Sequence, residues 1–478
     1  MSERPFTDAL EDALRDVDGR LQQQPASLEL NLERGALLEA LGHNDLARLT
    51  YAAILARTPG EVRTLNALGS LLYKTGARTA AQLAFAEAAS RHPEDVASHL
   101  NLAYTFVCTS RFEEARHHYE RALALDAQHP MAHQGLAYVL GELGDEVAAA
   151  RHRSAGFREP IIDGTYRGEG EPLRVLLLCS ALGGTVSTAQ FLDERIFLTT
   201  ALVVELFDAA EALPPHHVVF NAIGDADRCA PALARAGEIL TRTDAPIVNP
   251  PDAVLATGRQ ANAARLGAIA GVRAPRMESI DRTIPAPVSP FGYPVLVRVP
   301  GYHTGRFFTK VDRAEDLPDA LRSLPGDSAL AIEYLDSRGA DGKNRKYRAI
   351  IVDGELYPLH LAISNDWKIH YGTAQMSDAE HRAEEARFLA HMPAVLGPRV
   401  MASLQTIAGV MGLQFGGIDF GVDRAGNVLL YEANATMTVL VPEAHDAATY
   451  RRLPAERIVL AVMKMLARLG ARVDRLGR

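Results

Sequence analysis

The chain has 478 residues, of which 47% are hydrophobic and 23% are charged, and its formal net charge is -9. This composition is typical of a globular protein with about two to four domains, and the acidic balance argues against a protein that binds nucleic acid. The acidic start of the chain has no apolar signal region, and no apolar run reaches the roughly 18 residues of a membrane span, so we expect a cytoplasmic protein without a membrane contact.

The first third of the chain is repetitive. Small residues and large aromatic residues recur with the same period of 34 residues, the small ones at Ala47, Ala81, Ala115 and Ala149 and the large ones at Tyr51, Phe85 and Tyr119. A period of 34 residues is that of tetratricopeptide repeats, which are stacked pairs of helices. This resemblance extends over about residues 27–153, with a proline at each break between units: Pro25, Pro59 and Pro93.

A further helix is expected ahead of the repeats. Apolar residues recur at helical spacing from Phe6 to Leu21, which predicts a helix that covers the open end of the stack. We therefore expect an all-α repeat domain over residues 1–155. Such an array has no catalytic groups of its own; it offers a groove for a peptide or protein partner, or it mediates self-association. The sequence leaves both roles open.

The composition changes after the repeats. Residues 156–173 are rich in Gly, Pro and Glu, and we expect them to form a linker. From Arg174 on, apolar runs of the buried-strand type, at 174–179, 202–207 and 217–224, alternate with helix-compatible stretches. This alternation predicts an α/β domain over residues 174–250.

The next stretch carries basic, glycine-bearing and acidic motifs. A helix starting near Asp252 carries Arg259, and a predicted strand over 293–298 ends in Arg298. The motifs that follow are, in order, a loop with Gly301, His303 and Gly305, the segment Glu333-Tyr334-Leu335-Asp336, a basic segment from Lys343 to Arg348, a strand pair over 348–358, and a polar run with Trp367, Lys368, His370 and Tyr371.

The run GGIDFGVDRAGNVLLYEANAT near the C-terminus predicts a β-hairpin, with a turn over 423–427. Since side chains alternate between the faces of a strand, Asp419, Glu432 and Asn434 are able to share one face. Two carboxylates and an amide oxygen suit Mg²⁺, a hard cation that shares its shell with substrate phosphates, and this implies a nucleoside triphosphate. The alternative is that these three residues lie on the solvated face of an edge hairpin.

In this order, the motifs of the second half resemble those of the ATP-grasp superfamily, which includes D-alanine:D-alanine ligases, glutathione synthetases and RimK-type amino-acid ligases. The resemblance covers about residues 174–470. It implies an α+β multidomain protein: the tetratricopeptide-repeat array, a small α/β domain over 174–250 that precedes the ATP-grasp fold, and an ATP-grasp domain over 251–478.

The resemblance implies roles for individual residues. Asp419, Glu432 and Asn434 match the residues that hold Mg²⁺. Arg298 stands where the family usually has a lysine that meets the α- and β-phosphates of ATP, and Glu333-Tyr334-Leu335 match the hinge that faces adenine, with Asp336 placed to reach the ribose. The residues implied to bind ATP are Arg259, Arg298, Gly301, His303, Gly305, Glu333, Tyr334, Leu335 and Asp336.

Two residues are implied to act on the transferred phosphoryl group. Lys368 matches a basic residue that the relatives place on the phosphates, and Arg348 matches an arginine near the transferred group. We expect Lys343 and Lys346 to be solvent-exposed in a hydrophilic loop. The residues implied to line the pocket for the acceptor substrate are Trp367, His370 and Tyr371.

The chain departs from the family at one position. D-alanine ligases carry an arginine two residues before the metal-binding aspartate, and this chain has Gly417 there. Either Arg345 or Arg348 supplies the missing charge from another strand, or the site is incomplete and the chain is a binding protein.

The activity implied by the resemblance is that of an ATP- and Mg²⁺-dependent carboxylate-amine ligase. Such an enzyme forms an amide or peptide bond through an acyl phosphate, and its substrates are a small carboxylate and an amine, such as amino acids or peptides. Two alternatives stay open: an ATP-grasp phosphotransferase with a hydroxyl acceptor, and a non-catalytic scaffold with a degenerate nucleotide site.

Overall fold

The computed structural model describes residues 4–208, 210–282, 287–299, 307–324, 328–369, 371, 374–442 and 449–476. Side-chain burial is described for the same residues except 4–9, 328 and 472–476. The chain divides into two compact units, a helical unit that ends at Glu159 and an α/β unit that begins at Pro160. Each unit is described here by itself.

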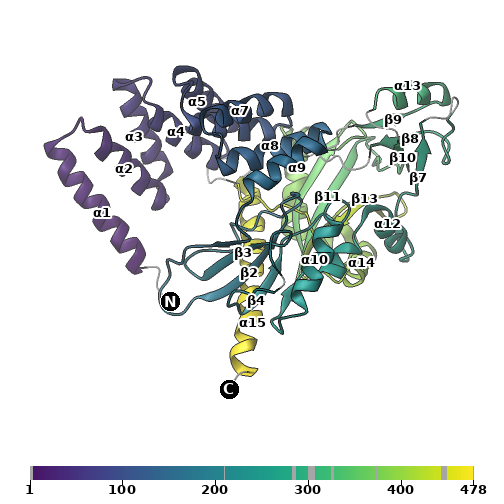
Figure 1. Ribbon diagram of the computed structural model, residues 1–478. Helices are drawn as coiled ribbons and strands as arrows, with labels where there is room; N and C mark the ends of the chain where they lie inside the picture. Colours follow the sequence, from purple (N-terminus) through teal and green to yellow (C-terminus); the bar gives the residue numbers. More distant parts are fainter. Residues whose placement is uncertain are drawn as a thin grey trace. The chain divides into compact units, whose positions relative to one another are not determined.

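The helical unit is an array of antiparallel helix pairs that follow one another along the chain (Figure 1). Helix α1 (Arg4–Gln23) precedes four pairs, as the sequence predicted. The pairs are α2 (Leu28–Ala40) with α3 (Asn44–Arg57), α4 (Val62–Lys74) with α5 (Arg78–Arg91), α6 (Val96–Cys108) with α7 (Phe112–Leu125), and α8 (Pro130–Leu143) with α9 (Glu146–Gly156).

The repeated residues form the contacts that the 34-residue period predicted. The four repeated alanines, from Ala47 to Ala149, are fully buried. Gly69 on α4 faces Phe85 on α5 so closely that a Cβ atom at Gly69 would lie 2.5 Å from the ring. A small residue therefore lets the two helices of a pair approach, and the aromatic side chain fills the space between them.

The α/β unit begins with a five-stranded sheet in the order β1-β3-β2-β4-β5. Three neighbouring pairs of strands are parallel, and β1 pairs with β3 antiparallel at the edge. The elements are β1 (Ile161–Asp163), β2 (Leu173–Cys179), β3 (Phe197–Val203), β4 (Val218–Asn221), α10 (Ala230–Leu240) and β5 (Ile247–Val248).

Three boundaries differ from the sequence prediction. The expected linker over 156–173 contains β1, because its apolar Ile161-Ile162 pairs with the exposed edge of β3. The strand expected over 202–207 lies earlier, at β3, where Phe197, Leu202 and Val203 are buried in the core. The helix expected to run from Asp252 through Arg259 is split into α11 (Pro251–Leu255) and α12 (Arg259–Gly267) by a turn at Gly258.

A four-stranded antiparallel sheet comes next, in the order β7-β10-β8-β9. One face of it carries a small core of its own around Val295, Val297 and Leu317. The elements are β7 (Met277–Asp281), β8 (Val295–Arg298), β9 (Phe308–Val311), the 3-10 helix η1 (Ala314–Asp316), α13 (Leu317–Arg322) and β10 (Ser328–Glu333).

The last sheet has five strands in the order β12-β11-β13-β14-β6. The predicted hairpin of β13 and β14 lies inside this sheet, with β11 on one side and β6 on the other, so it is not an edge hairpin. The elements are β6 (Val272–Arg273), β11 (Asn344–Val352), β12 (Glu355–Ser364), α14 (Ala379–Met411), β13 (Phe415–Val422), β14 (Val428–Asn434), the 3-10 helix η3 (Thr449–Arg451) and α15 (Arg452–Leu476).

Helix α14 is, among the described residues, the one helix long and apolar enough to cross a membrane by length and composition. It contains Pro393 and Pro398, and the backbone leaves the helical conformation at His391 and Gly397. Some of its apolar side chains, such as Phe388 and Leu404, are fully buried in the largest core of the α/β unit, whereas Val395 and Val410 are 42% and 40% exposed. The helix therefore packs part of its surface into this core.

Candidate functional site

A cavity of about 340 Å³ lies in the α/β unit between the four-stranded sheet and the last sheet. Its walls come from β8, β9 and β10 on one side and from β11, β13 and β14 on the other, with contributions from α12 and the segment 367–369. Most of the predicted site residues within the described part of the chain line it. These are Arg259, Arg298, Glu333, Tyr334, Leu335, Arg348, Trp367, Lys368, Asp419 and Glu432.

Strand register brings the two predicted metal-binding carboxylates to the same place. Asp419 on β13 is paired with Glu432 on β14, and a bulge follows directly after Asp419. On its other side Asp419 is paired with Arg348 on β11. Because directly opposed residues of antiparallel strands project their side chains to the same face, all three side chains reach the cavity.

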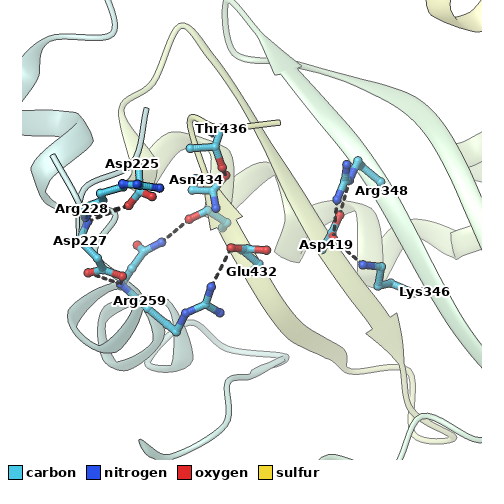
Figure 2. Close-up of polar contacts among 12 residues, drawn as sticks. Asp225, Asp227, Arg228, Arg259, Lys346, Arg348, Asp419, Glu432, Asn434 and Thr436 are labelled. Atoms are coloured by element: carbon cyan, nitrogen blue, oxygen red, sulfur yellow. Dashed lines mark hydrogen bonds and ion pairs between the residues drawn. The ribbon is translucent and has the colours of Figure 1, made fainter. Parts of the chain in front are cut away.

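Asp419 is held by two cations (Figure 2). Its side chain is only 2% exposed, and it accepts hydrogen bonds from Arg348 at 2.5 and 2.8 Å and from Lys346 Nζ at 2.8 Å. Burial by itself would raise the pKa of Asp419, but the charges of Lys346 and Arg348 hold that pKa well below its usual range. Asp419 is therefore an ionised carboxylate, and not a polar group on a solvated face.

Glu432 and Asn434 have different partners. Arg259 donates a hydrogen bond of 3.0 Å to Glu432 Oε1. The side-chain oxygen of Asn434 accepts from the backbone N–H of Thr436 at 3.0 Å and from its hydroxyl at 2.9 Å (Figure 2). Asn434 does not line the large cavity. The expected convergence of three oxygen ligands is thus limited, as the side chains stand, to Asp419 and Glu432.

The cavity is also lined by two cationic side chains from the other wall, Arg298 of the four-stranded sheet and Lys368 of the segment 367–369. Burial, together with the nearby guanidinium of Arg259, lowers the pKa of Arg298 to about 10. Burial also lowers the pKa of Lys368, and the charge of Arg298 lowers it further. Burial is the main cause of both shifts, and the repulsion between neighbouring cations adds to it, so the positive charges lie close together and an anion bound among them would be stabilised.

The predicted hinge residues lie at the end of β10. Glu333, Tyr334 and Leu335 line the cavity, and the carboxylate of Glu333 is bound by Arg276 at 3.0 Å. Asp336 is not among the lining residues. It forms an ion pair with Arg338 at 2.7 Å beside a separate surface hollow, so the structure does not bring Asp336 to the predicted nucleotide site.

Lys346 is the clearest correction. We expected it to be solvent-exposed in a loop, but β11 begins at Asn344, which makes Lys346 a strand residue whose side chain is 17% exposed and points into the cavity. Period-two alternation along β11 also places Arg348 there. Lys343, just before the strand, lies instead within 2.8 Å of His381 Nε2.

An arginine at position 417, as expected from the resemblance to D-alanine ligases, would not fit here. A Cβ atom at Gly417 would lie 2.6 Å from Met437 Cγ and 3.0 Å from the carbonyl oxygen of Ala349. Of the two candidates for supplying the charge, Arg345 is bound to Asp341 and Glu384 away from the cavity, whereas Arg348 lines it. Arg348 is therefore the arginine that the structure brings to Asp419.

The acceptor residues are only partly brought together. Trp367 lines the cavity and packs edge-on against Phe308. Tyr371 lies elsewhere, donating a hydrogen bond of 3.0 Å to the buried Glu385, with the guanidinium of Arg451 over its ring. His370 and the loop residues Gly301, His303 and Gly305 lie outside the described residues.

The residues present fit a metal ion only in combination with an anion. Within the described ranges, no group of three or more His, Cys, Asp or Glu side chains is placed to hold a metal. Asp419 and Glu432 are the two carboxylates that β13 and β14 bring to the cavity, and both are neutralised by cationic side chains. If those cations turn to an anionic ligand, the carboxylate oxygens become free for a hard cation such as Mg²⁺.

Comparisons with known proteins add little to this geometry. No protein-family model and no curated protein matches the chain. Solved structures similar to parts of it include MamA of Desulfovibrio magneticus RS-1, with 21% identity over 30% of this chain and 81% of that one and a TM-score of 0.27. Another is PilF of Pseudomonas aeruginosa, with 21% identity over 31% and 68% of the two chains and a TM-score of 0.30.

A third similar structure is a tetratricopeptide-repeat protein of Thermus thermophilus, with 20% identity over 31% of this chain and 81% of that one and a TM-score of 0.27. At these identities and TM-scores the similarities assign neither a family nor an activity to the chain.

Proposed function

We propose that the α/β unit is an ATP-grasp enzyme, an ATP- and Mg²⁺-dependent carboxylate-amine ligase. The observation that carries this proposal is the composition of the large cavity. Five cationic side chains surround it, together with two carboxylates from adjacent strands and a backbone segment at the end of β10. The cations are Arg259, Arg298, Lys346, Arg348 and Lys368.

The size and lining of the cavity suit a nucleotide. A volume of about 340 Å³ is within the usual range for small-molecule sites, roughly 300–1,000 Å³. Apolar side chains such as Leu296 on β8 and Ile332 on β10 line one wall, where a base would stack, and cationic side chains line both walls, with Arg298 on β8 and Lys346 and Arg348 on β11. Apolar surface and cationic side chains are the two environments that a nucleoside triphosphate needs.

The cationic side chains would bind and orient the phosphates. Arg298 and Lys368 approach from one wall, and Lys346 and Arg348 from the other, so charge would be offset on both sides of the transferred group. Asp419 and Glu432 would hold Mg²⁺. ATP would transfer its γ-phosphoryl group to a carboxylate, leaving ADP, and an amine would then attack the acyl phosphate to form the amide with release of phosphate and a proton.

The same residues explain how the site stays stable before the nucleotide binds. Asp419 is paired with Lys346 and Arg348, and Glu432 with Arg259. A buried carboxylate without a partner would be costly, so these ion pairs keep the site neutralised. Binding of a triphosphate with Mg²⁺ would exchange the pairs, because the cations would move to the phosphates and the carboxylates to the metal.

The activity is tested with Glu432→Gln. The substitution keeps the shape of the side chain but removes the negative charge, and we expect acceptor-dependent ATP turnover to fall roughly 10²- to 10³-fold. Turnover is measured as phosphate release in a screen of amino acids and peptides, with mass spectrometry of the products. Glu456→Gln, at an exposed ion pair on α15, is the matched control.

Three outcomes would contradict the proposal. Unchanged turnover in Glu432→Gln would remove the metal assignment. A phosphorylated hydroxyl product would indicate a phosphotransferase. Failure of the wild-type chain to bind a non-hydrolysable ATP analogue, measured by calorimetry with and without Mg²⁺, would leave the scaffold with a degenerate nucleotide site.

We infer a separate role for the helical unit, which contributes none of the cavity residues. Stacked helix pairs bind peptides or associate with one another. The unit therefore either docks a partner that carries a substrate or joins two copies of the chain. Sedimentation of the full chain over a range of concentrations distinguishes these cases, since a constant monomer mass would exclude self-association.

A further inference from the structure

Helix α14 carries a carboxylate, Glu385, that the proposed mechanism does not use. Its side chain is fully buried, at 0% exposed. Oε1 accepts a hydrogen bond of 3.1 Å from the backbone N–H of Leu361 and lies 3.4 Å from Nε of Arg451. Oε2 accepts hydrogen bonds from the hydroxyl groups of Tyr371, at 3.0 Å, and Tyr450. Since a carboxylate has about four acceptor positions, Glu385 holds all four groups at once.

The partners of Glu385 come from three separate parts of the chain. Leu361 is on β12, Tyr371 lies in the segment after β12, and Tyr450 and Arg451 belong to η3. A buried polar group that loses one of its partners is costly, so Glu385 keeps these parts in one arrangement against α14. Its importance for the site depends on what these parts carry.

The segment after β12 carries residues of the large cavity. Trp367, Lys368 and Ile369 are in the cavity lining. The ring of Trp367 packs edge-on against Phe308 of β9, and Nζ of Lys368 donates a hydrogen bond of 3.4 Å to the carbonyl oxygen of Phe308. The segment therefore reaches from the last sheet, where β12 ends, to the four-stranded sheet.

This segment is attached to the rest of the α/β unit on both sides of its cavity residues. Ahead of them, the side-chain amide of Asn344, which is 2% exposed, donates a hydrogen bond of 3.1 Å to the carbonyl oxygen of Asp366. After them, the hydroxyl of Tyr371 is bound to Glu385. Because Lys368 lies between the two attachments, its position depends on both.

The ring of Tyr371 is packed on the side of the sheet that carries Arg348. Its centroid lies 4.9 Å from that of the His360 ring, and the guanidinium carbon of Arg451 lies 4.0 Å from it. His360 on β12 is paired with Arg348 on β11, so the two side chains project to the same face. Tyr371 thus packs against the neighbour of the second cation expected to act on the transferred phosphoryl group.

We propose that Glu385 is a positioning residue for phosphoryl transfer. Through its hydrogen bond with Tyr371 it fixes the segment that brings Lys368 to the phosphates, although Glu385 itself is not in the cavity lining. The inference rests on the proposed ligase function for the role of Lys368, whereas the attachment of the segment is measurable without any activity.

The test removes one hydrogen bond and leaves Glu385 in place, because a substitution of a fully buried carboxylate endangers the fold. Tyr371→Phe keeps the packed ring and deletes the hydroxyl. Tyr450→Phe is the matched control, since it deletes a hydroxyl from the same oxygen of Glu385 but lies on η3 and not on the segment with Lys368. The two variants should therefore lose similar amounts of thermal stability.

Fluorescence measures the attachment of the segment directly, since Trp367 is the one tryptophan of the chain. We expect acrylamide to quench the fluorescence of Tyr371→Phe more strongly than that of the wild type, because the segment is no longer held at its end. The quenching constant of Tyr450→Phe should stay that of the wild type. Equal constants in all three proteins, or the same rise in both variants, would overturn the proposal.

Turnover tests the connection with Lys368. In the assay of acceptor-dependent phosphate release we expect Tyr371→Phe to lower kcat roughly tenfold to a hundredfold, as a small misplacement of a catalytic group does, and to change KM for ATP less. In a Lys368→Met background the same substitution should change kcat by less than roughly twofold, because the cation that it misplaces is already absent. Tyr450→Phe should leave kcat unchanged.

Two kinetic results would contradict the positioning role. If the losses from Tyr371→Phe and Lys368→Met multiply, the hydroxyl does not act through Lys368. An equal fall of kcat in Tyr371→Phe and Tyr450→Phe would show that Glu385 supports only the fold. A wild-type chain without acceptor-dependent turnover contradicts the ligase function itself, which is a different result, and the quenching comparison still decides whether Glu385 fixes the segment.

Discussion

The two units use charge in opposite ways. In the helical unit many ion pairs join residues one helical turn apart, such as Arg116 with Glu120, and both side chains are about half exposed. In the α/β unit the ion pairs of the cavity join residues that are distant in the sequence, such as Lys346 with Asp419 and Arg259 with Glu432, and Asp419 is buried.

This difference separates charges that support solubility from charges that build a site. An exposed pair on a helix contributes little, typically under about 1 kcal/mol, because water solvates both partners. A buried carboxylate between two cations is stable only while its partners remain, so each member of the group depends on the others. We therefore expect substitutions of charged residues to change the stability of the helical unit little and to destabilise the α/β unit when they fall in its cavity.

Removal of Asp419 tests this contrast with the largest expected effect. Asp419→Ala leaves the half-buried cations of Lys346 and Arg348 without their carboxylate, and we expect the α/β unit to be destabilised by about 3–5 kcal/mol. Hydrogen-exchange mass spectrometry should show faster exchange in the peptides of β11, β13 and β14, with unchanged exchange in α2 to α7.

The matched control is Glu120→Ala, which removes the carboxylate of an exposed pair in the helical unit and should cost under about 1 kcal/mol. A similar small cost for both variants would mean that the cavity ion pairs are solvated in solution, and the contrast between the two units would not hold.

The next prediction tests the helical unit, whose stability depends on the packing of its helices and not on ion pairs. The test is to add a methyl group where two helices pack closely. Gly69→Ala places a Cβ atom 2.5 Å from the Phe85 ring, and we expect a loss of about 1–3 kcal/mol. Faster exchange should be confined to the helical unit, and the affinity for an ATP analogue should not change.

Gly19→Ala is the control for this variant, because a Cβ atom at Gly19 in α1 has no atom within 4 Å. Alanine is the better helix former, so this change should stabilise the unit by about 0.5–1 kcal/mol. If Gly69→Ala were as stable as Gly19→Ala, the result would contradict the close packing of α4 against α5.

The helical unit was predictable from the sequence because its contacts repeat. Ala47 and Tyr51 indicate the same contact that Ala81 and Phe85 make one period later, so four weak signals add to a strong one. The boundary at 156–173 was less predictable. Strand β1 is short, and nothing in its own residues shows that the edge of β3 is available for pairing.

The sequence predicted the site residues that lie on one hairpin, Asp419 and Glu432. It did not predict Lys346, which reaches the cavity from a strand distant in the sequence. The spacing of Asp419 and Glu432 placed both on adjacent strands, as found. Lys346 was missed because its neighbours Lys343 and Arg345 make the segment look like a hydrophilic loop. The alternation of Lys346 and Arg348, with Tyr347 buried between them, was the signal of a strand with one charged face.

The cavity-facing position of Lys346 leads to a further prediction, whose expected effect is intermediate in size. Lys346→Met removes a cation that faces the cavity, and we expect the affinity for a non-hydrolysable ATP analogue to fall roughly tenfold. Lys343→Met, three residues earlier and outside the cavity lining, should leave the affinity unchanged. Calorimetry at low salt measures both. Equal affinities for the two variants would return Lys346 to the solvent-exposed role first expected.

The prediction with the smallest expected effect concerns the protonation of His118, a half-buried histidine of the helical unit. The Nδ1 atom of His118 lies 3.0 Å from Nδ1 of His99, and its ring stacks on Phe106. His99 Nε2 lies 3.2 Å from the carbonyl of Pro93, which accepts only, so Nε2 donates and Nδ1 of a neutral His99 accepts from His118. Burial, followed by the charges of His99 and His117, lowers the pKa of His118 to about 4.

The folded state therefore takes up a proton on His118 only near pH 4, whereas an unfolded histidine does so near pH 6.5. Between these values the unfolded chain binds more protons, so this stabilising contribution is complete above about pH 6.5 and is lost as the pH falls toward 4. His118→Gln removes the titrating group, and its unfolding temperature should decline less than that of the wild type over this interval. Parallel declines of the two unfolding temperatures, followed by circular dichroism, would show that His118 is solvated, and the helical unit would then tolerate charge even at its half-buried positions.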